Sequence, residues 1–133
     1  REIRKEVKDI RGWVTTLPKT AFISIMGSAR LRPGNKYYNV VKDLSFNLGK
    51  RGYGIITGGG PGIMEAANKG AYGAGSHSIG VNIVLPHEQK LNKYVNLSFA
   101  RCYDDFIPRK IALFAPANVI LIAPGGFGTL NEI

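Results

Sequence analysis

Short apolar runs alternate along the chain with longer segments of helical periodicity. The predicted strands cover residues 21–26, 54–57, 78–85, 97–103 and 118–123. The predicted helices cover residues 1–11, 36–50, 63–73 and 106–115. Short apolar runs bounded by glycine or proline are typical of strands buried on both faces of a parallel sheet. Strands alternating with helices predict an α/β fold, a Rossmann-like doubly wound, mostly parallel sheet with helices on both faces.

The length of 133 residues fits a single Rossmann-like domain over residues 1–133, with residues 1–19 as an N-terminal helical extension. In the helix predicted over residues 36–50, the apolar face carries Val40, Val41, Leu44 and Leu48. The chain begins with Arg1 and ends in the first turn of a further predicted helix. We therefore expect it to be part of a longer protein, with the C-terminal part of the domain missing.

The composition excludes several classes of protein. No apolar run approaches the ~20 residues needed to span a bilayer, so we expect a cytoplasmic protein that does not bind membranes. Cys102 is the only cysteine, which excludes an intrachain disulfide and a cysteine-rich metal site. We interpret Cys102 as a small packing residue and predict no metal site.

The formal net charge of +9 gives the chain a field that attracts anions. The basic residues are spread out, and Asp43 is the only acid between residues 10 and 64. A basic stripe with interleaved aromatic residues is absent from the sequence, so we do not expect nucleic acid as the partner. A small phosphorylated ligand is the favoured interpretation.

Two glycine-rich segments each follow a predicted strand and open a predicted helix. They are residues 58–62 and 125–128. Glycine allows the backbone to approach an anion, and the N–H groups of a helix N-terminus point at it. The pair predicts a phosphate clamp, although tight turns also use glycine for packing alone. The dinucleotide fingerprint and the P-loop GK[ST] are not met, which argues against a nicotinamide-dependent dehydrogenase and an ATPase.

Four charged residues near these loops have a structural and a functional interpretation. Glu132 can complete a helix capping box with Thr129 or act as a catalytic carboxylate. Glu65 can stabilise the positive end of its helix or face the site. Arg109 and Lys110 can form a solvated charge pair, or Arg109 can face a ligand with its planar fork.

The sequence resembles the LOG family, the cytokinin riboside 5′-monophosphate phosphoribohydrolases formerly described as lysine decarboxylases. The resemblance rests on PGGFGTLNE (124–132), which matches the family's PGGxGTxxE, and on Arg109-Lys110 upstream of it. TGGGPGIMEAAN (57–68) and Gly27-Ser28 also match. With LPHEQ (85–89), the second motif looks like the bacterial branch of the family.

This resemblance implies an N-glycosidase that converts a purine nucleoside 5′-monophosphate to free base and ribose 5-phosphate, without a cofactor. The base, including any N6 modification, is left open. Glu132 and Arg109 are the implied catalytic residues. The implied phosphate- and substrate-binding residues are Ser28, Gly59, Gly60, Lys110, Gly125, Gly126, Gly128 and Thr129, with Glu65 as a further candidate. The family also implies a homodimer or higher homo-oligomer. The alternatives are a non-catalytic nucleotide sensor or cofactor carrier and a nucleic-acid-binding relative of the same fold.

Overall fold

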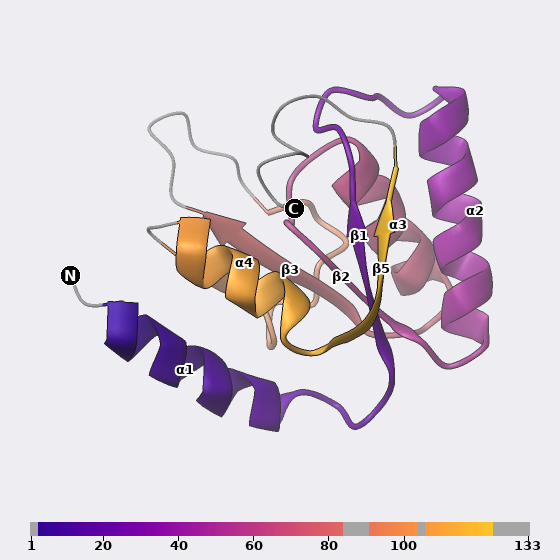
Figure 1. The fold of residues 1–133 in the computed structure, drawn as a ribbon. Coiled ribbons are helices and arrows are strands. Elements are labelled where there is room, and N and C mark those ends of the chain that lie inside the picture. The colour runs from indigo at the N-terminus through magenta and orange to yellow at the C-terminus, as the bar shows by residue number, and fades with distance from the viewer. Residues whose placement is uncertain (1–2, 84–90, 104–105, 124–133) are drawn as a thin grey trace.

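The computed structural model describes residues 3–83, 91–103 and 106–123 (Figure 1). Within them, parallel strands form one sheet in the order β4-β3-β2-β1-β5. The strands are β1 (Phe22–Met26), β2 (Gly54–Thr57), β3 (Ser78–Ile83), β4 (Arg101–Tyr103) and β5 (Ala117–Ile122). The helices are α1 (Ile3–Thr16), α2 (Lys36–Lys50), α3 (Ile63–Gly73) and α4 (Phe106–Phe114). None of the helices in the described ranges is both long and apolar enough to cross a membrane.

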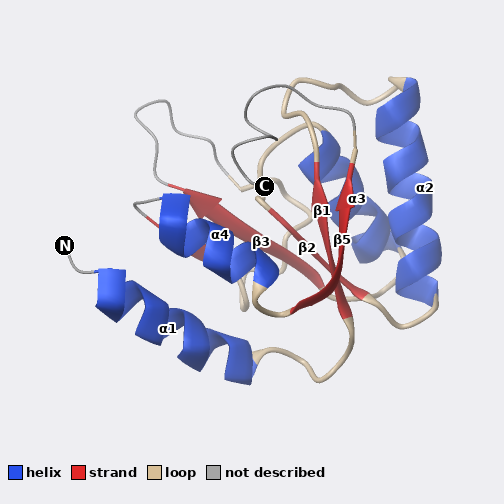
Figure 2. Ribbon diagram, in the orientation of Figure 1, coloured by secondary structure: helices blue, strands red, loops and turns tan. Residues whose placement is uncertain are grey.

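Helices cover both faces of the sheet (Figure 2). The α2 and α3 helices pack side by side on one face, and α1 lies beside α4 on the other. Each face has its own apolar core, built around Trp13, Met26 and Leu113 on the α1 side and around Ile25, Ile55 and Ala67 on the α2 side. This arrangement confirms the predicted Rossmann-like fold.

The strand predicted over residues 97–103 occupies only residues 101–103. Residues 97–99 form turns in which the Phe99 N–H donates to the Asn96 carbonyl. The Asn96 side chain also accepts from the Ser98 N–H at 3.1 Å, as asparagine does in a turn. This local bonding replaces a ladder in the first half of the predicted strand.

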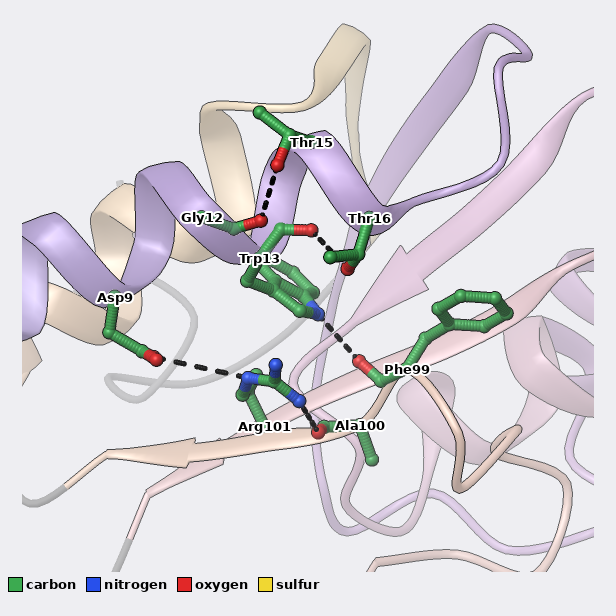
Figure 3. A network of polar contacts seen from close by, with 8 residues as sticks. All are labelled: Asp9, Gly12, Trp13, Thr15, Thr16, Phe99, Ala100 and Arg101. Atoms are coloured by element: carbon green, nitrogen blue, oxygen red, sulfur yellow. Dashed lines mark hydrogen bonds and ion pairs between the residues drawn. The ribbon is translucent and has the colours of Figure 1, made fainter.

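The first helix is longer than predicted, because it continues through Gly12 to Thr16. The continuation buries Trp13, which is 1% exposed, and its indole N–H donates to the Phe99 carbonyl at 2.8 Å (Figure 3). Asp9 of the same helix lies 3.9 Å from the Arg101 guanidinium. The α1 helix therefore contributes to the core and is joined to residues 99–101.

The predicted apolar face of α2 is wrong in two of its four positions. Val40 and Leu44 are 61% and 42% exposed, whereas the buried residues of this helix are Tyr38, Val41, Ser45 and Gly49. The reason is the close approach of α3, where a Cβ added to Gly70 would lie 2.2 Å from the Lys42 carbonyl oxygen. So short a separation leaves room for serine and glycine and turns the larger aliphatic residues outward.

A buried hydrogen bond also joins the two helices. The Tyr38 hydroxyl of α2 donates to Glu65 Oε2 of α3 at 2.6 Å, and Tyr38 is 1% exposed. Burial of the phenol, followed by this hydrogen bond and the Glu65 charge, raises the pKa of Tyr38 above its ordinary value of 10.0. The folded state therefore keeps the phenol protonated where the unfolded chain ionises.

Replacing Trp13 by Ala tests whether α1 belongs to the core. The substitution empties a fully buried site, so we expect the free energy of unfolding in urea to fall by about 3–5 kcal/mol. Arg11→Ala, an exposed position on the same helix, is the control and should change it by less than about 0.5 kcal/mol. Similar losses in the two variants would contradict the assignment.

Tyr38→Phe tests whether burial of the Tyr38 phenol makes the stability of the protein depend on pH. The stability that depends on keeping Tyr38 neutral is complete below the unfolded pKa near 10 and is lost as the pH rises beyond it. The unfolding free energy of the wild type minus that of the variant should be constant below about pH 9 and smaller by about 1.4 kcal/mol at about pH 11. Tyr37→Phe, at the exposed neighbouring position, is the matched control. The same pH dependence for both variants would contradict the effect.

Candidate functional site

The direction of strand order reverses at β1. From β1 the chain adds β2, β3 and β4 on one side, and β5 then returns to the other side of β1. Ligands of such sheets bind beyond the carboxyl ends of the strands at this reversal. The Ala123 N–H, just after β5, donates to the Met26 carbonyl at the end of β1 at 2.8 Å. The chain therefore leaves β5 at the reversal, directly before the motif of residues 124–132.

Five of the predicted site residues fall within that motif. Gly125, Gly126, Gly128, Thr129 and Glu132 lie outside the described residues. The others, on the loops after β1 and β2 and on α3 and α4, are described.

Ser28 lies against the N-terminus of α3. Its carbonyl accepts from the Ile63 N–H at 2.9 Å. Gly62, at φ +73°, makes this contact possible, since an added Cβ would lie 2.2 Å from the Ser28 carbonyl oxygen. A Cβ on Gly27 would likewise lie 2.4 Å from the Ile63 side chain. The loops after β1 and β2 are therefore in direct contact, and one N–H of the first turn of α3 is bound within the protein.

Arg109 is buried against the glycine loop that follows β2. It is 4% exposed, and it donates from Nη2 to the Gly58 carbonyl at 3.3 Å and from Nε to the Val81 carbonyl at 3.1 Å. A Cβ on Gly58 would lie 2.2 Å from Nη2, so the loop needs glycine beside the guanidinium. The interpretation of Arg109 as half of a solvated charge pair is therefore wrong. Lys110 is half-buried.

The burial of Arg109 gives it a structural role in addition to any catalytic one. A buried cation is tolerated only where hydrogen bonds replace its hydration, and here two backbone carbonyls do so. The positive charge is consequently fixed at the carboxyl ends of β2 and β3. A fixed charge of this sign raises the affinity of the neighbouring loop for an anion.

A buried polar network behind the loop was not anticipated from the sequence. Asn68 of α3 accepts at Oδ1 from the Thr57 hydroxyl at 2.6 Å and from Asn92 Nδ2 at 3.1 Å. Its own amide donates to Ser78 Oγ at 2.9 Å and to the Ile79 carbonyl at 3.3 Å. The sequence did contain a signal for this network: Thr57 ends β2, Ser78 begins β3, and Asn68 lies on the side of α3 that faces the sheet.

Glu65 and Cys102 have different surroundings from those expected. The Glu65 carboxylate accepts a hydrogen bond from the Tyr38 hydroxyl, so this side chain connects α3 to α2. Cys102 is exposed, and its interpretation as a packing residue is wrong, because it lies on the edge strand β4. Among the described residues, no cluster of His, Cys, Asp and Glu has the geometry to hold a metal ion.

Curated proteins of one group are similar to this chain in sequence. It is 32% identical over 106 residues to a probable cytokinin riboside 5′-monophosphate phosphoribohydrolase, LOGL5, of Oryza sativa subsp. japonica, across 76% of this chain and 42% of that protein. The probable enzyme LOGL3 of the same plant is 30% identical across 75% of this chain and 48% of its own length. The chain thus spans about half the length of these curated relatives.

Solved structures share the fold. The X-ray structure of TM1055 has a TM-score of 0.67 at 26% identity, over 84% of this chain and 65% of that one. The molybdenum cofactor carrier protein of Chlamydomonas reinhardtii has a TM-score of 0.70 at 24% identity, over 86% of this chain and 68% of its own. At that identity the second likeness shows the fold alone.

The family comparison covers the whole sheet and both glycine loops. The model of the SLOG cluster4 family matches residues 20–133, which include the motif of residues 124–132 and leave out α1. The chain therefore belongs to the SLOG cluster4 family, in agreement with the LOG family membership predicted from its motifs.

Proposed function

We propose that the full-length protein hydrolyses the N-glycosidic bond of a purine nucleoside 5′-monophosphate, releasing the free base and ribose 5-phosphate. The observation that carries the proposal is the reversal of strand order at β1. The hydrogen bond from the Ala123 N–H to the Met26 carbonyl holds the end of β5 beside the start of the loop that contains Ser28, and the 124–132 motif follows Ala123 directly in the sequence. The LOG relatives, described as probable phosphoribohydrolases, support the reaction class.

The chemistry requires a negative charge near the ribose. As the bond from C1′ to the base nitrogen breaks, positive charge develops on the sugar, water forms the new bond to C1′, and the base takes up a proton. A carboxylate stabilises that charge or activates the water, and we assign this role to Glu132. Arg109, fixed at the Gly58 carbonyl, is the second proposed catalytic residue and would orient the substrate and stabilise charge on the departing base.

We assign phosphate binding to the two glycine loops. Gly59 and Gly60 would contribute from the loop after β2, and Gly125, Gly126, Gly128 and Thr129 from the loop after β5. Ser28 and Lys110 complete the proposed substrate-binding set, and Glu65 remains a candidate. We further propose that the protein forms a homodimer or higher homo-oligomer in the cytoplasm, that it belongs to the bacterial branch of the LOG family, and that it needs no cofactor.

A product assay decides between this proposal and the carrier alternative. The full-length protein is incubated with AMP, GMP, CMP and N6-isopentenyl-AMP, and free base and ribose 5-phosphate are quantified. Hydrolysis of a purine monophosphate supports the enzyme. Tight binding of the same compounds without product would favour a nucleotide sensor or carrier, a possibility kept open by the likeness of the fold to molybdenum cofactor carrier proteins.

Removal of the 5′-phosphate should abolish most of the activity. Two helix N-termini on one phosphate provide charge-assisted hydrogen bonds that a nucleoside cannot replace. We expect kcat/KM for adenosine to be at least ~100-fold below that for AMP, about 3 kcal/mol of transition-state binding. Equal turnover of the two compounds would exclude the phosphate clamp.

Glu132→Gln separates the catalytic role of Glu132 from a capping role. Gln keeps the shape and can still reach the backbone N–H of Thr129, but it has no charge. For a catalytic carboxylate we expect kcat to fall at least ~100-fold while AMP still binds. Near wild-type hydrolysis would leave Glu132 as a capping residue only, whose loss in Glu132→Ala should cost ~0.5–2 kcal/mol of stability.

A further inference from the structure

The carbonyls of Gly58, Gly59 and Gly60, which are consecutive in the glycine loop after β2, each accept a hydrogen bond. Arg109 Nη2 donates to Gly58, the Asn92 N–H to Gly59 at 2.8 Å, and Asn92 Nδ2 to Gly60 at 3.0 Å. Asn92 alone therefore binds two of the three, once with its backbone and once with its side chain. It is 9% exposed and lies far from the loop in sequence.

The contact on the Gly59 carbonyl fixes the direction in which the Gly60 N–H points. In a trans peptide the N–H is directed opposite to the C=O of the same unit. Because the Gly59 carbonyl points at Asn92, the Gly60 N–H points to the opposite side of the loop. The Gly59 N–H is held by Thr57 Oγ1 at 2.9 Å, so the peptide units on either side of Gly59 are both fixed.

Sterics reinforce the same contact. Gly59 has φ +77°, and a Cβ there would lie 2.6 Å from Leu91 Cδ2, next to Asn92. A Cβ on Gly80 would lie 3.0 Å from the Gly59 Cα. The loop is thus packed between β3 and residues 91–92 with no space for a side chain, which limits the conformations open to it.

We propose that Asn92 is a positioning residue for the phosphate: it holds Gly59 and Gly60 so that the Gly60 N–H faces the ligand. The inference rests on the proposed function in so far as the ligand is a nucleoside monophosphate. Asn92 reaches the ligand only through Gly59 and Gly60. Loss of its side chain releases the Gly60 carbonyl, while the backbone N–H still holds Gly59. Phosphate affinity then falls, because Gly60 must be ordered again each time the anion binds.

The test compares Asn92→Ala with Asn96→Ala in the full-length protein. Both asparagines accept from the backbone N–H two residues ahead, Asn92 from Tyr94 and Asn96 from Ser98, and Asn92 in addition donates from Nδ2 to the Gly60 carbonyl. Calorimetric titration gives the Kd of AMP, of adenosine and of inorganic phosphate for each protein. Asn92→Ser is the milder variant, because serine can still accept the turn bond from Tyr94 but is too short to reach Gly60.

For both Asn92 variants we expect the Kd of AMP and of phosphate to rise about tenfold, while the Kd of adenosine changes less than about twofold. Asn96→Ala should leave all three values unchanged. Equal weakening of AMP and adenosine, or no weakening in a folded Asn92→Ser protein, would show a structural residue only. Failure of the wild type to bind AMP or phosphate would also overturn the proposal. Failure to hydrolyse AMP despite binding would instead refute the proposed reaction and leave this inference standing.

Discussion

The side-chain amide of Asn68 holds together the part of the structure on which the candidate site depends. It lies fully buried between α3 and the sheet and makes four hydrogen bonds, which use all of its donors and acceptors. Each buried polar atom left without a partner would cost about 1–3 kcal/mol of stability. The residues that bind the Asn68 amide are therefore held in place together with it. Those partners lead to the glycine loop from two directions, through Thr57 on β2 and through Asn92.

Close approach of backbones is the second constraint on the site. Gly62 and Gly27 let the loop after β1 contact the first turn of α3, and Gly58 leaves room for the Arg109 guanidinium. A methyl group at any of these positions would overlap a neighbouring atom. These glycines therefore have a packing role, which was the alternative to phosphate binding that the sequence left open. Packing and anion binding are compatible, because the same tight turn brings several N–H groups to one side.

The sequence predicted those parts of the fold that follow from local pattern. The strand at 54–57 and the helices at 36–50 and 63–73 lie where periodicity and glycine turns indicated them. Features set by tertiary contact were missed, namely the buried face of α2, fixed by its approach to Gly70, and the burial of Arg109, fixed by carbonyls far away in sequence. The role of Asn92 could not be predicted, because the sequence around an isolated asparagine in a loop does not show whether its side chain forms a local turn or binds a distant loop. The catalytic role of Glu132 in the motif of residues 124–132 was assigned by resemblance to the LOG family, and the roles of the motif's side chains remain predictions.

A loop that binds phosphate does not by itself make a protein an enzyme. A loop whose carbonyls are held by Arg109 and Asn92 and whose Gly60 N–H points to the other side would bind phosphate equally in the ground state and the transition state. Equal binding of both states does not accelerate a reaction. Turnover in this chain therefore requires a group that acts only as the ribose becomes positively charged, and Glu132 is the carboxylate that the motif supplies one turn from the predicted cradle. Its two possible roles compete, because a carboxylate bound to the N–H of Thr129 in a capping box has fewer lone pairs for water or for the sugar.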